Sequence, residues 1–325
     1  MQGSLALAHG VVWLGRHART AEIRVFDLDG RELAGGFRIP PIVEDLELAG
    51  GNGDPRPGRS RSATRTLGRS TASGLAVDGD RRLWVADEAG ARVRAFNVFG
   101  AESATITGAA AEEGALLERD TLELLGRPGD VALVARSDET GESSDELLVA
   151  SRGRRRHALR RYGLDGELRA SLRPLGDPEG SFSDLRGVAT FGELVFACDE
   201  DAGRVQVFRR DEFHFAIAAP GGGARRVFRP RAAAPLADGR LLVAIGGESS
   251  ALLLLDGAGR LLRTIAEHGT EVGQVFEPGD VIVEEGHSDE RTRVIVVDCD
   301  GDRVQAFSLV GRCWGTFRGL PRTDD

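Results

Sequence analysis

One short unit recurs along this chain, and the repetition limits the possible folds more than any other feature. Clear copies lie at 71–100, 184–208 and 278–311. In each copy an Asp stands five residues before an Arg-Val pair, and an aromatic residue follows that Arg by four. The matched residues are Asp87, Arg92 and Phe96; Asp199, Arg204 and Phe208; and Asp298, Arg303 and Phe307. Self-similarity of this kind predicts a repeat architecture.

Three weaker copies, at 11–30, 146–166 and 240–259, share the same frame. The aromatic position of the six copies is held by Phe26, Phe96, Tyr162, Phe208, Leu255 and Phe307. The last three intervals between these anchors, of 46, 47 and 52 residues, fit a four-stranded propeller blade. Within each copy the expected strands are short and rich in β-branched or aromatic residues. The sequence therefore predicts an all-β fold, a six-bladed β-propeller of four-stranded antiparallel blades.

The whole chain, 1–325, is expected to form this single domain. The blades are predicted at about 3–37, 72–108, 128–173, 184–218, 228–266 and 278–318, with connector insertions at 38–71 and 109–127 that show no strand pattern. The first unit is expected to hold four strands, at about 4–8, 11–16, 22–28 and 32–37, and so is the last, at 281–285, 294–298, 303–309 and 312–317. The ring should therefore close by packing of blade on blade. Asp78-Gly79 predicts a two-residue turn with positive φ between the first two strands of its blade.

Segments such as GLAVDGDRRLWVADEAGARVRAF and GQVFEPGDVIV resemble NHL repeats, which form six-bladed propellers. The resemblance covers most of 3–318 and is strongest in the second, fourth and sixth blades. It implies the fold. It implies little about activity, because propellers carry many unrelated functions. Members of related six-bladed families bind proteins, bind RNA, or act as metal-dependent hydrolases and lyases.

The three Asp/Arg pairs have two readings, a repeated ligand site around the channel or structural ion pairs within the blades. Their recurrence at one position of alternating blades favours ion pairs that fix the turn between the second and third strands. The pairs are Asp87 with Arg92, Asp199 with Arg204, and Asp298 with Arg303.

No catalytic residue, metal ligand or cofactor is expected. The six histidines show no metal-binding spacing, and no G-x-S-x-G is present. Tyr162, the one tyrosine, stands at a core anchor, and Cys198 and Cys299 stand beside carboxylates that raise a thiol pKa. The early Glu-Gly-Pro of gluconolactonase-like enzymes is missing from 4–10. Three widely spaced cysteines and the lack of a long apolar run predict a cytoplasmic protein without membrane insertion.

Arginine clusters give the main functional signal. The net charge is −9, yet all 42 basic residues are arginines, which bind carboxylates and phosphates bidentately. Propeller topology places three arginine-rich loops on one face, here called the arginine face, although acidic residues also lie on it. The candidate partner-binding residues are Arg56, Arg59, Arg61, Arg65, Arg69, Arg152, Arg154, Arg155, Arg156, Arg225, Arg226, Arg229 and Arg231.

These observations favour a non-enzymatic binding or scaffold propeller that presents the arginine face to an anionic partner, an acidic protein surface or another subunit. One alternative is an RNA-binding propeller, although aromatic stacking residues are missing among the arginines. A second alternative is a metal-dependent hydrolase or lyase whose ligands come from different blades. The sequence leaves the identity of the partner and the oligomeric state open.

Overall fold

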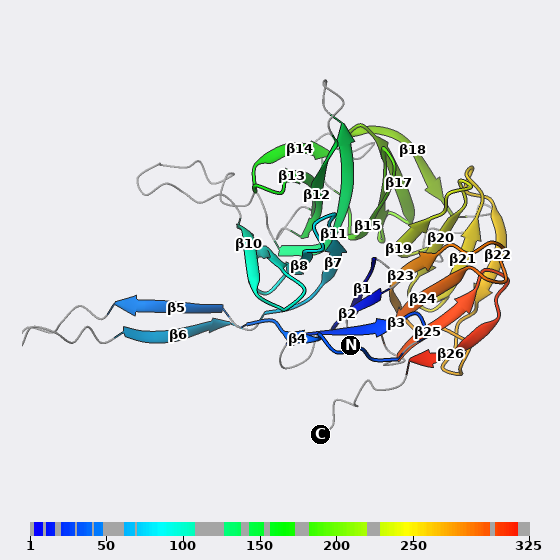
Figure 1. Ribbon diagram of the computed structural model, residues 1–325. Coiled ribbons are helices and arrows are strands. Elements are labelled where there is room, and N and C mark those ends of the chain that lie inside the picture. The colour runs from blue at the N-terminus through cyan, green and yellow to red at the C-terminus, as the bar shows by residue number, and fades with distance from the viewer. Residues whose placement is uncertain are drawn as a thin grey trace, which may run out of the picture.

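The computed structural model shows a ring of antiparallel sheets with no helix among the described residues (Figure 1). Consequently those residues contain no helix that could cross a membrane. The described residues are 3–8, 11–16, 21–29, 31–40, 42–47, 62–68, 70–107, 127–137, 143–152, 157–172, 182–219, 228–299 and 303–317.

Six four-stranded sheets form the ring, and the strand order within each follows the chain. The first three blades consist of β1 (Gly3–Ala8), β2 (Val11–Arg16), β3 (Glu22–Asp27) and β4 (Phe37–Arg38); β7 (Gly74–Val77), β8 (Leu83–Asp87), β9 (Arg92–Phe96) and β10 (Glu102–Thr107); and β11 (Arg127–Ser137), β12 (Ser143–Arg152), β13 (His157–Gly163) and β14 (Leu168–Leu172). The other three consist of β15 (Leu185–Phe191), β16 (Leu194–Asp199), β17 (Arg204–Arg209) and β18 (Glu212–Ala218); β19 (Pro230–Pro235), β20 (Leu241–Ile245), β21 (Ala251–Leu255) and β22 (Leu261–Ala266); and β23 (Pro278–Glu284), β24 (Arg293–Asp298), β25 (Arg303–Ser308) and β26 (Cys313–Phe317). The expected six-bladed β-propeller is confirmed.

The first strand of each blade lies innermost. Each of these strands, β1, β7, β11, β15, β19 and β23, contacts the first strand of the next blade, and β23 contacts β1. All four strands of every blade come from one continuous stretch of chain. The ring therefore closes by packing of the last blade on the first, with no strand exchanged.

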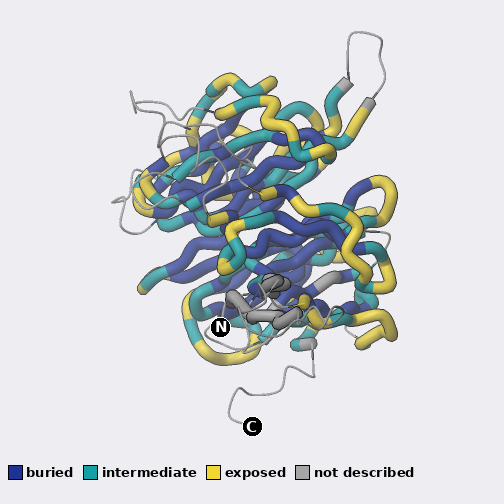
Figure 2. Tube along the Cα trace, turned by 90° about the vertical axis from the view of Figure 1, so that its left-hand side faces the viewer, coloured by how far each residue is buried: buried dark blue, intermediate teal, exposed yellow. Residues whose placement is uncertain are grey.

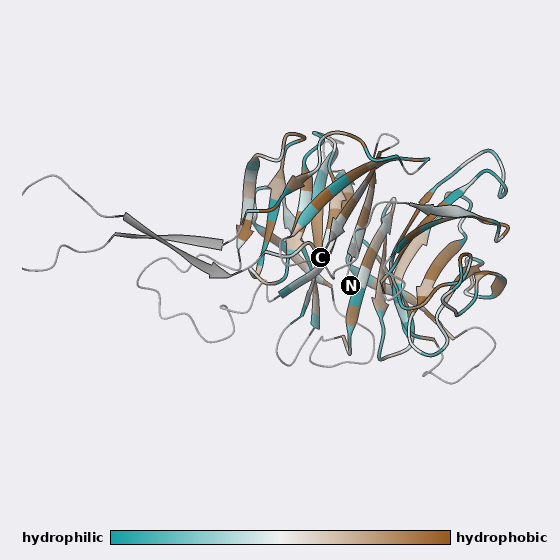
Figure 3. Ribbon diagram, turned by 90° about the horizontal axis from the view of Figure 1, so that it is seen from below, coloured by the Kyte–Doolittle hydropathy of each residue, from teal (hydrophilic) through white to brown (hydrophobic). Residues whose placement is uncertain are grey.

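The core lies between neighbouring blades, as one apolar cluster at each of the six blade interfaces. All six anchor residues are buried, and each pairs in register with an apolar residue on the second strand of its own blade. Phe208, for example, is opposite Val195. Buried residues follow the strands while turns are exposed (Figure 2), and apolar segments lie within the blades (Figure 3).

Two local expectations are wrong, and a third lies almost wholly outside the described residues. The connector 38–71 holds an antiparallel hairpin, β5 (Ile42–Glu47) with β6 (Ser62–Gly68), which projects from the ring (Figure 1). A lone two-stranded ribbon has a weak sequence signal because it covers no core. The fourth strand of the first blade spans only Phe37–Arg38, where 32–37 was expected. The second connector, 109–127, lies outside the described residues except for Arg127, which begins β11.

The turn at Asp78-Gly79 is also longer than predicted. The loop runs from Asp78 to Arg82, and positive φ occurs at Arg81, at 62°, rather than at Gly79. The buried Asp78 carboxylate sets this shape. It accepts hydrogen bonds from the Arg82 backbone N–H at 2.8 Å and from Trp84 Nε1 at 2.8 Å. A side-chain acceptor thus replaces the tight glycine turn.

Candidate binding site at the channel mouth

The innermost strands enclose a central cavity of about 320 Å³. Each of these strands is the edge of its sheet, so its outward backbone N–H and C=O groups face the channel without a neighbouring strand. The innermost strands begin at the arginine face, because the turns between second and third strands lie at the same end. This end of the cavity is called the channel mouth below.

A β-bulge marks the start of the innermost strand in the last four blades. The bulged residues are Gly129, Arg186, Arg231 and Gly279. Gly129 follows the second pair of its ladder, and the other three follow the first pair. Three of these strands begin with proline or hold it beside their first residue, and proline cannot donate to the ladder. A bulge redirects side chains next to it. Arginine and aspartate at or after the bulge are therefore turned toward the mouth instead of continuing the strand pattern.

Asp130 and Asp280 follow the two bulged glycines in opposite blades and line the cavity. Asp130 accepts backbone N–H groups of Val131 and of Val188 in the next blade, each at 2.8 Å. Asp280 accepts those of Val281 and of Leu5 in the first blade, each at 2.7 Å. Each carboxylate thus bridges two blades, and that of Asp280 bridges the ends of the chain.

The two carboxyl groups also affect each other. Burial raises the pKa of Asp280 from its ordinary value to about 7, against the opposing effect of its backbone hydrogen bonds. Burial, followed by the charge of Asp280, raises the pKa of Asp130 well above its usual range. These are the titrating carboxyl groups of the cavity.

Gly74 permits the close approach of the second and third blades beside this site. A Cβ atom at Gly74 would lie 2.5 Å from the Asp130 Cα and 2.7 Å from the Val131 nitrogen. Both are backbone atoms and cannot turn aside. Only glycine therefore allows the innermost strand of the second blade to lie against Asp130.

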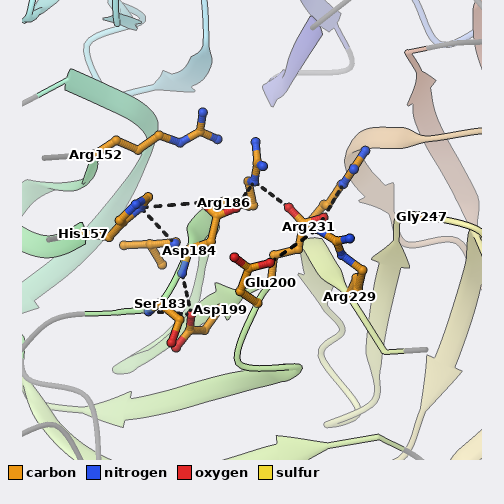
Figure 4. Close-up of polar contacts among 12 residues, drawn as sticks. Arg152, His157, Ser183, Asp184, Arg186, Asp199, Glu200, Arg229, Arg231 and Gly247 are labelled. Carbon is orange, nitrogen blue, oxygen red and sulfur yellow. Dashed lines mark hydrogen bonds and ion pairs between the residues drawn. The ribbon is translucent and has the colours of Figure 1, made fainter. Parts of the chain in front are cut away.

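Glu200 organises the arginines of the mouth (Figure 4). It is fully buried and lies at the end of β16. Its carboxylate is 2.5 Å from Arg186 Nε, 3.0 Å from Arg229 Nη2 and 3.1 Å from Arg231 Nε. Three guanidinium groups from the fourth and fifth blades therefore share one buried anion, which fixes their positions around the channel.

Arg231 is held on its other side by Glu277, through an ion pair between Arg231 Nη1 and Glu277 Oε2. Glu277 has a φ of 66°, which is unfavourable for a residue with a side chain. Its Oε1 also accepts the Gly247 N–H at 2.7 Å. Glu277 lies just before the first strand of the sixth blade, and its carboxylate reaches back to the fifth blade. These contacts hold its unfavourable backbone conformation at the edge of the candidate site.

Arg186 differs from its neighbours in the use of its guanidinium. Both of its ion pairs, with Asp184 at 2.8 Å and with Glu200, use Nε. Its two terminal amino groups donate no hydrogen bond within the part of the chain that the structure describes. About 29% of the side chain is exposed. Arg186 therefore presents a fixed fork of N–H donors at the mouth.

The third blade completes this side of the mouth with His157 and Arg152 (Figure 4). His157 Nδ1 accepts the Leu185 N–H at 3.2 Å and lies 3.6 Å from Asp184 Oδ1. Burial lowers the pKa of His157, against the opposing charge of Asp184. Neutral His157 suits the acceptor role toward Leu185. Arg152 Nη1 is 3.8 Å from Glu88.

The structure brings the residues of each predicted Asp/Arg pair together. The Nε–Oδ2 distances are 3.3 Å for Arg92–Asp87, 3.7 Å for Arg204–Asp199 and 2.9 Å for Arg303–Asp298. All three aspartates are fully buried. Each also accepts a backbone N–H from the segment that enters its blade, namely Thr71, Ser183 and Phe276. The pairs therefore join the second turn of a blade to its first strand.

Of the predicted partner-binding arginines, Arg152, Arg229 and Arg231 lie at the mouth, each within ion-pair distance of a carboxylate. Arg65 lies on β6 and its side chain is outside the described residues. The others are also outside them: Arg56, Arg59, Arg61, Arg69, Arg154, Arg155, Arg156, Arg225 and Arg226.

Sequence reasoning missed Arg186, Glu277, Asp130 and Asp280, and it did not single out Glu200 among the acidic residues of the arginine face. A signal was present, since Pro-Gly-Asp occurs at both 128–130 and 278–280. When the innermost strands are aligned on this triplet, Arg186 and Arg231 fall at the position of its glycine.

The remaining polar candidates are accounted for within the described residues. Cys198 is buried, and burial, with nearby carboxylates, raises its pKa well above the ordinary value. No group of three His, Cys, Asp or Glu side chains in the described ranges has a metal-binding arrangement. His9 and His17 lie outside those ranges.

Comparison of the sequence with family models and with curated proteins gives no match, so the resemblance to NHL repeats stays a prediction. Solved structures do match. A chain of the nidogen/laminin complex has 15% identity, a TM-score of 0.57 and coverage of 95% of this chain and 94% of its own. A streptogramin B lyase has 11% identity, a TM-score of 0.54 and coverage of 99% and 84%. U3-55K has 12% identity, a TM-score of 0.53 and coverage of 95% and 78%. Because these proteins differ widely in what their names describe, the likeness shows a propeller fold alone.

Proposed function

We propose that this propeller is a non-catalytic binding protein whose arginine face, centred on the channel mouth, binds the carboxylates of an acidic protein surface or of another subunit. One observation carries the proposal: the free fork of Arg186, whose Nε is held by Asp184 and Glu200. A fork fixed in this way binds a carboxylate through two parallel hydrogen bonds with little loss of side-chain freedom.

The surrounding charges support a local rather than a general attraction for anions. Asp184, Asp201 and Glu277 accompany the arginines of the mouth, and the chain carries a net charge of −9. An anionic partner therefore gains energy only where its carboxylates meet free guanidinium N–H groups. Screening acts over about 8 Å at physiological salt, so only direct contacts contribute.

Binding of a fluorescent hexaglutamate peptide to wild type and to Arg186→Gln tests the proposal. We expect Arg186→Gln to weaken binding by about 1–3 kcal/mol, the contribution of charge-assisted hydrogen bonds, while the protein stays folded. Added salt should weaken binding to wild type more than to the variant. The triple change of Arg154, Arg155 and Arg156 to Ser is expected to act in the same direction. Fluorescence anisotropy at low and physiological salt measures both effects.

Arg260→Gln is the matched control. Arg260 is also ion-paired, with Asp256 at 2.7 Å, but its side chain is 82% exposed and lies in a turn on the opposite face. Its replacement should leave peptide affinity unchanged. Equal affinities of wild type and Arg186→Gln would contradict the proposal. Tighter binding of an oligouridylate than of the peptide, lost in Arg186→Gln, would favour the RNA-binding alternative.

A further inference from the structure

The central cavity has a charged end and aliphatic walls. At the mouth its lining includes Asp130 and Asp280. Further along, all six innermost strands contribute aliphatic residues, such as Leu7, Val77 and Leu133. A cavity of about 320 Å³, whose lining side chains are aliphatic apart from Asp130, Asp280 and Thr190, has room and convergent polar groups for a small molecule.

The hydrogen bonds at this end favour two ionised carboxylates. Each of the four oxygen atoms of Asp130 and Asp280 accepts one backbone N–H, an arrangement that stabilises the charged form. Burial and mutual repulsion oppose it. Among the described residues no arginine or histidine forms an ion pair with either group. Arg152 acts on Asp130 only through its charge.

The bridging role alone does not account for both acids. At the equivalent position the other four blades carry Ser4, Gly74, Gly187 and Ala232, and their interfaces close without a carboxylate. Two carboxyl groups at one end of a cavity, with no ion-pair partner among the described residues, form a site in which a bound cation relieves their mutual repulsion.

We propose that the channel binds a small amphiphilic organic cation, whose primary ammonium group lies between Asp130 and Asp280 and whose aliphatic part lies along the channel. An ammonium group has three N–H donors, which suit the second lone pairs of these oxygens and the unpaired carbonyls of the edge strands. A hard metal ion needs six or more oxygen ligands, whereas the described side chains supply two carboxylates that already accept N–H groups. The aliphatic walls also favour a ligand with a carbon chain.

This inference does not depend on the proposed function, because it rests on the channel acids rather than on the arginines of the mouth. Titration of wild type with n-butylammonium chloride by isothermal calorimetry, at about pH 8, above the pKa of about 7 of Asp280, tests it. We expect saturable one-to-one binding. The neutral isostere n-butanol should not bind at the same concentrations, and n-hexylammonium should bind more tightly than n-propylammonium because it buries more apolar surface.

Asp130→Asn and Asp280→Asn should each weaken butylammonium binding by about tenfold or more, since each removes one of two charges. Asp80→Asn is the matched control. Its carboxylate is 81% exposed and lies away from the channel, so its loss should leave affinity unchanged. Should the channel variants fail to fold, the pH dependence of wild type replaces them. Lowering the pH to about 5, below the pKa of about 7 of Asp280, protonates that carboxylate and should weaken binding by about tenfold or more.

Three results would overturn the inference: no saturable binding of any alkylammonium to folded wild type, equal affinity for butylammonium and butanol, or binding that is unchanged at the lower pH. Competition by calcium or magnesium chloride at stoichiometric concentration would also overturn it, because the cation would then be a metal ion. Loss of hexaglutamate binding in Arg186→Gln with butylammonium binding intact separates this site from the arginine site.

Discussion

Replacing Asp298 with alanine is expected to lower the free energy of unfolding by about 3–5 kcal/mol, the cost of removing one partner of a buried ion pair. The carboxylate is fully buried, lies 2.9 Å from Arg303 Nε and accepts the Phe276 N–H at 2.7 Å. Its loss removes an acceptor from two part-buried donors, the Phe276 N–H and Arg303 Nε. Asp87→Ala should act similarly, since Asp87 accepts the Thr71 N–H. Urea denaturation followed by tryptophan fluorescence measures both.

Asp80→Ala is the comparison for these changes, because Asp80 also faces an arginine, at 3.5 Å, but is 81% exposed. An exposed pair contributes about 0–1 kcal/mol. Hexaglutamate binding should change little in Asp298→Ala protein that is still folded. A stable Asp298→Ala protein that had lost peptide affinity would show that the repeated pairs belong to a ligand site.

Replacing Glu200 with glutamine is expected to destabilise the fold by about 3–5 kcal/mol, because three guanidinium groups then lose their shared buried counter-charge. Glu200 is fully buried and contacts Arg186, Arg229 and Arg231 at 2.5–3.1 Å. Glutamine keeps the shape and one acceptor, so the effect reports mainly the charge. Urea denaturation measures the stability change.

The same variant separates positioning from simple charge at the mouth. Glu200→Gln makes the mouth more positive, and attraction by charge alone would strengthen hexaglutamate binding. We expect weaker binding instead, because the fork of Arg186 is then held at its Nε by Asp184 alone. In the double variant with Arg186→Gln, the second change should cost little further affinity, as expected for coupled neighbours. Stronger peptide binding by folded Glu200→Gln would contradict the positioning role.

Much of the fold follows from local patterns in the sequence. The anchors Phe96 and Phe208 each pair with the adjacent strand of their own blade, so their spacing in sequence reports the blade directly. The Asp/Arg pairs are likewise five residues apart and meet across one turn. The β5–β6 hairpin escaped prediction because it contributes nothing to the apolar pattern of the ring.

The candidate site was predictable only in part. Arg229 and Arg231 fell within an arginine-rich loop and were singled out on composition. Arg186 stands alone in its segment, and its importance comes from a bulge and from Glu200 on the neighbouring strand. A bulge depends on how a strand meets its partner, which composition does not reveal.

The sequence by itself determined the number of blades, their strands and their buried anchors, because these depend on contacts between residues close in the chain and repeated six times. Only the tertiary structure decided which charged groups face one another at the channel mouth. Asp130 and Asp280 meet there because closure of a six-membered ring places the third and sixth blades opposite each other. Arg186 and Arg231 contact Glu200, and Glu277 contacts Arg231, because three successive blades begin at the same end of the channel. The physical reason is that the charge environment of a residue is summed over all its neighbours in space, and most of those neighbours lie on other blades.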